Sequence, residues 1–454
     1  MPTTTRRGDA GRWAYLPEFA LANLPRYTSY PPANRFHAGI ADKDAAAAIA
    51  SLPDGASLSL YVHIPFCKKL CWYCGCHTSV PTAADPVDAY LDALIREFDQ
   101  VGRRLTADAS VTHLHFGGGS PDILRPDQAD RLIQALRRTF RFRPDAEIAA
   151  ELDPRGVTAE IVDAFVRNGL TRASLGVQVL APHVQARINR VQPRHEVEKA
   201  IRLLRKAGVG ALNVDLMYGL PEQTLADVEE TALFAASQDA DRVAAFGYAH
   251  VPWFKKHQKA IRPEALAGGE ERFRQAEAAA ATLLRAGYVA VGFDHFAAPH
   301  DSLVRADRAG TLRRNFQGYT NDCADALLGF GASAISTCGS LAWQNTTDAT
   351  AYRTSLAEGQ ATVARGLRAT AAELRTGRVI ERILCQFEAD IPADMRIEAC
   401  PTLGRLEDNG LIAWSGHRLL VTERGRPYVR NVAAAFDPGI QKPEGAPLRH
   451  SLAV

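Results

Sequence analysis

Short apolar segments alternate with amphipathic helical stretches from about residue 58 to residue 251, and this repeat restricts the possible folds more than any other feature of the chain. Repeated strand–helix units predict a parallel sheet with helices on its outside. Six such units predict an α/β fold, a partial barrel of the TIM type, whose functional site forms at the C-terminal ends of the strands. The predicted strands cover residues 58–64, 111–116, 147–152, 172–178, 211–219 and 243–251.

Each predicted strand ends in a loop of unusual composition. Because the strands are expected to be parallel, these loops should gather at one end of the barrel. Helical stretches return the chain to the other end, and the one at residues 158–169 has Thr158 as its expected N-cap and Gly169 as its stop. The loop sequences, in chain order, are CKKLCWYCGC, GGGSPD, ELDPRG, GVQ, YGLPEQ and YAHVPW.

The last hundred or so residues differ in character. Residues 370–387 and 401–410 read as helices, and residues 411–425 alternate around a Ser415-Gly416 turn, which is typical of a hairpin. This is a winged-helix-like order. Because the region carries no basic stripe, we expect it to pack or to act as a lid instead of binding nucleic acid.

The first forty or so residues are rich in Pro and Tyr and show little periodicity, so we expect an arm laid over another surface. Three regions are therefore predicted. They are an N-terminal arm over the active site (residues 1–45), a barrel with the cysteine loop (46–340) and a mostly α, winged-helix-like domain (341–454).

The chain has no strong electrostatic bias. Its net charge is +2, which points to neither nucleic acid nor an anionic membrane surface. No apolar run is long enough to span a bilayer, and the N-terminus lacks the apolar core of a signal peptide. We therefore expect a soluble, cytoplasmic protein. In that compartment thiols stay reduced, and clustered cysteines more often bind metal or perform chemistry than form disulfides.

Four of the eight cysteines lie within ten positions, as Cys67, Cys71, Cys74 and Cys76. Four thiolates could hold zinc in a closed tetrahedral site. Zinc modules, however, usually use two separated Cys pairs and not one compact run after a barrel strand. The alternative is an iron–sulfur cluster, which also takes thiolates. A cluster held by three cysteines leaves one iron without a protein ligand, open for chemistry. The other four cysteines are scattered and are expected to be small core residues.

The stretch CKKLCWYC resembles the CxxxCxxC signature of the radical S-adenosylmethionine (SAM) enzymes. In that family three cysteines bind a [4Fe–4S] cluster and SAM chelates the fourth iron. Further stretches narrow the resemblance to the oxygen-independent coproporphyrinogen III oxidases, from about residue 26 to about residue 436. They are RYTSYP, YVHIPFC, the CxC extension through Cys76, GGGSP, ELDPR, LGVQ, INRVQ, NVDLMYGLP, YAHVPW and DHFA.

The resemblance implies a radical SAM oxidoreductase of porphyrin and haem biosynthesis. Two propionates of coproporphyrinogen III become vinyl groups, giving protoporphyrinogen IX, by means of a SAM-derived 5′-deoxyadenosyl radical. It also implies two bound SAM molecules, an electron donor such as flavodoxin or ferredoxin, an electron acceptor of unknown identity, and a monomer without nucleic-acid or membrane partners.

The site residues are carried over from the same resemblance. Cys67, Cys71 and Cys74 should ligate the cluster, whereas Cys76 should not, because a fourth protein ligand would close the iron that SAM needs. Tyr61 and Glu151 are implied as catalytic residues that bind the first SAM. The remaining implied SAM contacts are Tyr73, Gly118, Gly119, Ser120, Gln178, Arg190, Asp215, Ala249 and Ile335.

A substrate with four carboxylates needs cationic anchors. The candidates are Arg26, Lys255, Lys256, His295, Arg313 and Arg314, although an ordinary surface charge is the simpler interpretation of each one taken alone. His63 is either a support for the cysteine loop or a satisfied core histidine. His113 and His115 alternate on a strand, but the sequence offers no third ligand for a metal pair.

Three alternatives remain open. A haem chaperone relative shares the CxxxCxxC loop and barrel but typically lacks the CxC extension and the RYTSYP arm. A haem-degrading or methyl-transferring relative is a second possibility. The third, of a different class, is a zinc-binding winged-helix module for nucleic acid, against which the near-neutral charge and the GGGSP, ELDPR and GVQ stretches argue.

Overall fold

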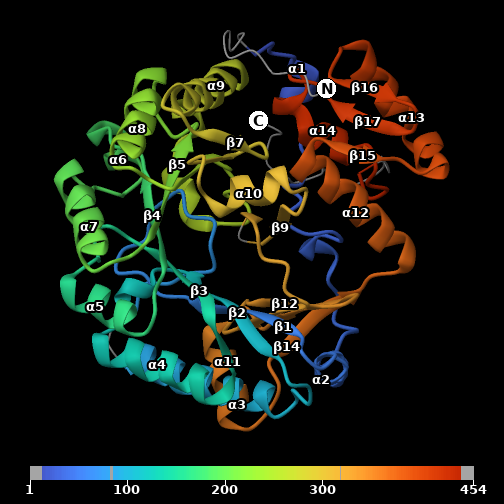
Figure 1. Cartoon of the computed structure of the whole chain (residues 1–454). Helices are drawn as coiled ribbons and strands as arrows, with labels where there is room; N and C mark the ends of the chain where they lie inside the picture. The colour runs from blue at the N-terminus through green and yellow to red at the C-terminus, as the bar shows by residue number, and fades with distance from the viewer. Residues whose placement is uncertain (1–12, 82–84, 317, 441–454) are drawn as a thin grey trace.

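The computed structural model describes residues 13–81, 85–316 and 318–440. Its main sheet has twelve strands in the order β14-β13-β12-β11-β1-β2-β3-β4-β5-β6-β8-β7, so within the described residues its two ends do not meet. The partial barrel predicted from the sequence is thus confirmed (Figure 1). Its first six strands are parallel neighbours: β1 (Ser57–Ile64), β2 (Ser110–Gly118), β3 (Phe142–Leu152), β4 (Arg172–Gln178), β5 (Ala211–Tyr218) and β6 (Arg242–Gly247).

Helices cover the outer face of this sheet (Figure 1). The apolar residues of α4, such as Leu132, Ile133 and Leu136, belong to the same buried core as the outward side chains of the strands. The Thr158 hydroxyl accepts a hydrogen bond from the Ile161 N–H, as expected of an N-cap. The helices are α3 (Asp85–Gly102), α4 (Pro126–Thr139), α5 (Ala159–Arg167), α6 (Pro182–Arg187), α7 (Arg194–Lys206), α8 (Leu225–Ser237) and α9 (Gly269–Arg285).

The two faces of β1 show how the barrel interior is built. Leu58, Leu60 and Val62 are completely buried against the helices. The alternate positions are polar, and Ser59 and His63 among them are also buried. Because side chains alternate along a strand, these polar groups share the interior face with every second residue of the neighbouring strands.

The sheet continues beyond the six parallel strands. β11 (Ala326–Phe330) pairs parallel with β1, and β12 (Ile335–Cys338), β13 (Leu341–Asn345) and β14 (Val363–Arg368) follow as an antiparallel meander. The predicted boundary at residue 340 therefore falls between two paired strands of one sheet. We propose that the C-terminal domain starts after β14. At the opposite edge β8 (His295–Ala297) and β7 (Val289–Val291) continue the sheet antiparallel beside β6, and β9 (Arg313–Asn315) and β10 (Gly318–Thr320) form a separate two-stranded sheet. The remaining helices are α10 (Ser302–Arg308) and α11 (Ala349–Ala357).

The C-terminal region has the predicted order of helix, helix and hairpin. The hairpin strands are antiparallel around residues 415–418, and a short third strand joins them. The second helix begins at Ala393, earlier than the predicted residue 401, and contains Pro401. The elements are α12 (Ala371–Gln386), β15 (Glu388–Asp390), α13 (Ala393–Asp408), β16 (Ile412–Ser415), β17 (Arg418–Val421) and α14 (Val429–Ala434). Residues 441–454 of the predicted domain lie outside the described part of the chain.

The N-terminal segment packs on the C-terminal domain. Phe19, Leu24 and Tyr27 share a buried cluster with α12 and α14, and the Leu16 N–H donates to the Tyr428 hydroxyl at 2.8 Å. Figure 1 shows α1 (Pro17–Ala20) beside this domain. A second helix, α2 (Asp42–Ala50), crosses the predicted boundary at residue 45. Residues 1–12 of the predicted arm lie outside the described residues, and within those no helix is long and apolar enough to cross a membrane.

Candidate active site

The loops at the C-terminal ends of the parallel strands enclose a cavity of about 200 Å³, here called the cysteine cavity. Most of the side chains predicted from the sequence meet there, although they come from six separate segments. Tyr61, Ala249 and Ile335 do not line it. The predicted residues in its lining are Cys67, Cys71, Tyr73, Cys74, Cys76, Gly118, Gly119, Ser120, Glu151, Gln178, Arg190 and Asp215.

The cysteine loop is fixed to the barrel by hydrogen bonds from buried groups. His63 bonds through Nε2 to the His77 carbonyl at 2.9 Å and through Nδ1 to the Tyr61 hydroxyl at 3.0 Å. The Asn189 side-chain amide donates to the Leu70 carbonyl at 2.8 Å. His63 is therefore both a buried, satisfied histidine and a support of the loop, so the two predicted roles coincide.

A second loop, at residues 252–260, is also hydrogen-bonded to the backbone of the cysteine loop. The Lys255 ammonium donates to the Cys76 carbonyl at 2.8 Å, and His257 Nε2 lies 2.8 Å from the Cys74 carbonyl. The Gln258 amide donates to the Tyr73 carbonyl at 2.9 Å. The sequence analysis did not identify His257 or Gln258. Lys255, predicted as a substrate anchor, is engaged with the backbone of the cysteine loop.

Two arginines surround the Cys71 sulfur. Arg155 and Arg190 each donate to Cys71 Sγ at 3.4 Å, and the Asp153 carboxylate accepts from both guanidinium groups. Two guanidinium groups therefore face a sulfur that would carry negative charge as a metal ligand. Asp153 and Arg155 were quoted within ELDPR, but no role was predicted for them.

The other three thiols differ in their proton affinity. A hydrogen bond between Cys74 and Cys76 lowers the pKa of Cys74 to about 7, against the effect of burial, and raises the pKa of Cys76. Burial raises the pKa of Cys67 to about 11, although the Thr78 hydroxyl lies 3.0 Å from its sulfur. Among these three thiols the surroundings therefore favour the thiolate at Cys74 alone, and they do not choose between Cys67 and Cys76.

Glu151 stands at the end of β3 as an ionised carboxylate. Burial alone would raise its pKa, but the contact of His115 Nε2 with Oε1 at 3.0 Å and the Gly118 N–H bond to Oε2 at 3.3 Å leave it lowered. The glycines of GGGS allow this arrangement. A Cβ on Gly117 would lie 2.9 Å from the Glu151 carboxyl group, and Gly118 has a φ of +106°.

Ser120 is held differently from the other predicted contacts. Its hydroxyl donates to the buried Asp122 carboxylate and accepts from the Asp153 N–H at 3.1 Å. It therefore lines the cavity while its hydrogen-bonding capacity is largely used within the protein. The hydroxyl connects the glycine loop to the end of β3, which makes it a support of the cavity wall.

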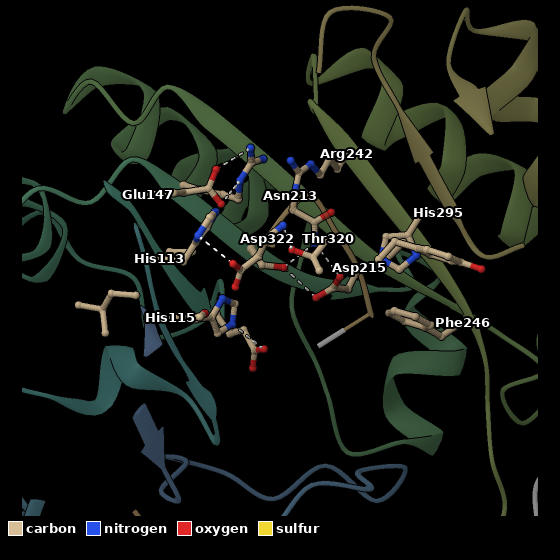
Figure 2. Close-up of a pocket in the computed structure, with 18 residues that line it drawn as sticks. His113, His115, Glu147, Asn213, Asp215, Arg242, Phe246, His295, Thr320 and Asp322 are labelled. Atoms are coloured by element: carbon tan, nitrogen blue, oxygen red, sulfur yellow. Dashed lines mark hydrogen bonds and ion pairs between the residues drawn. The ribbon is translucent and has the colours of Figure 1, made fainter. Parts of the chain in front are cut away.

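A second, more polar cavity of about 240 Å³ occupies the barrel interior and is called the interior cavity (Figure 2). Glu151, Ser174 and Asp215 line both cavities, so the two are neighbours. Asp215 accepts from Ser174 at 3.0 Å and from Asn213 at 2.9 Å. Burial, followed by the charge of Glu151, raises the pKa of Asp215 to about 6. A cationic ligand at this junction would meet two carboxylates.

Figure 2 also shows that the two strand histidines do not form a metal pair. His113 pairs with Asp322 at 3.2 Å, whereas His115 pairs with Glu151 at 3.0 Å. Among the described residues, no three His, Cys, Asp or Glu side chains are grouped to hold a metal ion.

The cysteine cavity suits a larger group than one metal ion. Its four loop thiols line a space of about 200 Å³, which has room for a multi-iron cluster. The buried Nε of Arg190 has no hydrogen-bond partner among the described groups, which also fits a polar ligand beside this wall.

The six predicted substrate anchors do not share one site, although Arg26, His295 and Arg314 all lie near the buried Asp294 carboxylate. His295 lines the interior cavity and pairs with Asp294 at 2.7 Å. Arg26 donates to the Gly247 carbonyl at 2.6 Å, and Lys256 is exposed. Arg313 and Arg314 pair with Glu381 and Asp294 and line a separate cavity of about 420 Å³ under the N-terminal arm. The structure does not bring the six candidates to one place.

Residues 61–235 match the family model described as the Radical SAM superfamily. The chain is 44% identical to an oxygen-independent coproporphyrinogen III oxidase of Bradyrhizobium diazoefficiens over 91% of this chain and 94% of the relative. It is 42% identical to an anaerobic coproporphyrinogen III oxidase of Cereibacter sphaeroides, with 82% of each covered. A solved structure of coproporphyrinogen III oxidase from Escherichia coli, described as a radical SAM enzyme, superposes with a TM-score of 0.87 at 36% identity, covering 91% and 97%.

Proposed function

We propose that this chain, which belongs to the oxygen-independent coproporphyrinogen III oxidases of the radical SAM superfamily, carries out the family reaction at its two adjoining cavities. That reaction is the oxidative decarboxylation of two propionates of coproporphyrinogen III to vinyl groups, which gives protoporphyrinogen IX. The observation that carries the assignment is that the cysteine cavity and the interior cavity share Glu151, Ser174 and Asp215.

The residues of the cysteine cavity suit the two cofactors of the family. When bound, the reduced [4Fe–4S] cluster and SAM supply a 5′-deoxyadenosyl radical that removes hydrogen from the substrate. Cys67, Cys71 and Cys74 would hold the cluster. Arg155 and Arg190 would stabilise the negative sulfur of Cys71, to which both already donate.

Glu151 and its partners would bind the positively charged groups of SAM. SAM carries a positive amino group and a sulfonium, and Glu151 and Asp215 provide negative charge at the junction of the cavities. His115 holds the Glu151 carboxylate in place and favours its ionised form. Gln178 and Arg190 would complete the polar wall for a second SAM.

The interior cavity would take the reacting propionate. Its walls are rigid because the charges there are paired with one another, as Arg242 with Asp301 at 2.8 Å and Arg172 with Glu147 at 3.2 Å. Per vinyl group formed, one hydrogen atom and one carbon dioxide leave the side chain, and one electron passes to an acceptor. His295 is the predicted anchor placed to meet a carboxylate there.

The remaining assignments are predictions from the family. A flavodoxin or ferredoxin would donate electrons, an acceptor not identified by the sequence would take the last one, and the protein would act as a monomer. A cytoplasmic location would keep the cluster thiols reduced.

A Cys76→Ser variant should retain its iron and sulfide, because we propose Cys67, Cys71 and Cys74 as the ligands. Serine keeps a hydroxyl that can still donate to the Cys74 sulfur, whereas it provides no thiolate at position 76. Iron and acid-labile sulfide are measured after anaerobic reconstitution. Complete loss of the cluster would show that Cys76 is one of the ligands.

A Glu151→Ala variant should keep the cluster but bind SAM about 10- to 100-fold more weakly, as expected for the loss of a charge-assisted bond worth about 1.5–3 kcal/mol. The measurement is SAM titration of the reconstituted protein by calorimetry. The Glu151→Gln variant keeps the shape of the side chain but not its charge, so its affinity for SAM should lie between those of Glu151→Ala and the wild type. Equal SAM affinity in all three proteins would show that Glu151 does not contribute to SAM binding.

Anaerobic turnover tests the function directly. Reconstituted protein with SAM, dithionite and coproporphyrinogen III should yield protoporphyrinogen IX and carbon dioxide together with 5′-deoxyadenosine. Haem binding without any vinyl product would favour the chaperone alternative. Zinc without sulfide in the isolated protein would favour the third alternative.

A further inference from the structure

The loop at residues 252–260 exposes two large aromatic side chains. Trp253 keeps 51% of its surface exposed and Phe254 keeps 67%, although most aromatic residues of the chain are buried. Neither side chain lines the cysteine cavity or the interior cavity. Exposed aromatic groups of this size mark interaction surfaces more often than isolated surface positions.

Positive charge surrounds these two rings. Residues 248–263 contain Lys255, Lys256, Lys259 and Arg262 but no Asp or Glu. The neighbouring cysteine loop, residues 67–81, adds two lysines and again no acid. The chain as a whole is nearly neutral, at +2, so six positive charges over these two short segments form a strong local excess. A negatively charged partner is favoured here.

The same loop is bonded directly to the cysteine loop. Lys255, His257 and Gln258 reach the carbonyls of Cys76, Cys74 and Tyr73 at 2.8, 2.8 and 2.9 Å. The loop that exposes Trp253 and Phe254 is therefore in direct contact with the backbone of the cysteine loop. A protein resting on Trp253 and Phe254 would lie close to a cluster held by those thiols.

We propose that residues 252–260 are the docking surface for a small acidic electron-transfer protein of the flavodoxin class, an inference that rests on the proposed function. On contact, the flavin hydroquinone anion of the partner becomes the neutral semiquinone, and the electron that it loses reduces the cluster. Encounters of this kind use small, charge-matched interfaces that separate again readily.

The test compares a Lys256→Glu/Lys259→Glu double variant with the wild type. Both positions are exposed and neither lines a cavity of the site. Using reconstituted holoenzyme and a purified oxidised flavodoxin, calorimetry at low salt should show binding weakened by about tenfold or more. The dependence of binding on salt should also become less steep. Trp253→Ala should weaken binding without changing that salt dependence.

Turnover separates this proposal from the proposed function. Rates driven by reduced flavodoxin should fall in the double variant, whereas rates driven by dithionite should match the wild type. Lys43→Glu, an exposed charge reversal on α2, is the matched control and should behave as wild type in both assays.

Two results would overturn the docking surface. The first is unchanged flavodoxin affinity in the double variant and in Trp253→Ala. The second is a raised KM for coproporphyrinogen III under dithionite, which would assign the loop to substrate entry. If the wild type itself failed to turn over with dithionite, the proposed function would fail, while the binding measurement would still decide on docking.

Discussion

A Cys71→Ser variant is expected to lose its iron, its sulfide and all measurable turnover together. Cys71 is the buried member of the loop cysteines, and two arginines donate to its sulfur. A serine hydroxyl would stay protonated there and would ligate iron poorly. The loss of metal affinity should be larger than the roughly 10- to 100-fold loss that follows when a residue supporting a ligand is substituted. Iron and sulfide analysis after anaerobic reconstitution measures it.

The matched control for this variant is Cys400→Ser on α13, which is remote from the cysteine loop in sequence. The prediction that the scattered cysteines are core residues was wrong for Cys323 and Cys400, because both are exposed. The Cys400→Ser protein should reconstitute and turn over like the wild type. A Cys71→Ser protein that still binds a full complement of iron would contradict the ligand assignment. SAM cleavage in such a protein would contradict it more strongly, since an open iron must then be supplied by another set of three thiols.

A Glu97→Ala variant should have the largest effect on folding. Glu97 is a buried carboxylate on α3 that accepts four hydrogen bonds, from the Gly331 N–H, the Asn345 amide, and the Tyr352 and Thr362 hydroxyls at 2.6–3.1 Å. Alanine would leave these donors buried without an acceptor, and we expect the free energy of unfolding to fall by about 3–5 kcal/mol.

Denaturant unfolding of the reconstituted variant measures this loss. Asp99→Ala, an exposed acid on the same helix, should change stability by no more than about 0.5 kcal/mol and is the control for helix propensity. Glu97→Gln keeps the size of the side chain and should retain part of the stability. If Glu97→Ala were as stable as Asp99→Ala, the four bonds would not contribute to holding α3 on the sheet.

The parallel part of the fold could be predicted because its pattern is local. The alternation of Leu58, Leu60 and Val62 with polar residues fixes β1, and the loop compositions fix which end of the strands carries the site. The last strand was predicted too long. β6 ends at Gly247 because Tyr218 on β5 is its final partner, and the YAHVPW stretch leaves the sheet there.

Other features depend on contacts between distant residues and carry no local signal. Gln258 bonds to Tyr73 across 185 positions, and His257 bonds to Cys74 across 183. The roles of Asp153 and Arg155 follow from their distance to the Cys71 sulfur, which the spacing of ELDPR does not encode. The antiparallel strands β13 and β14 were not predicted, because short strands resemble loops in sequence.

The bond between Leu16 and Tyr428 joins positions 412 residues apart, and it has a consequence for biosynthesis. Ribosomes add roughly 5–20 residues per second, so the first helix waits tens of seconds for its partner to emerge. The nascent barrel therefore exists for a time with one side uncovered. Until then the apolar side chains of the N-terminal segment that belong to the C-terminal cluster, such as Phe19 and Leu24, have no folded partner.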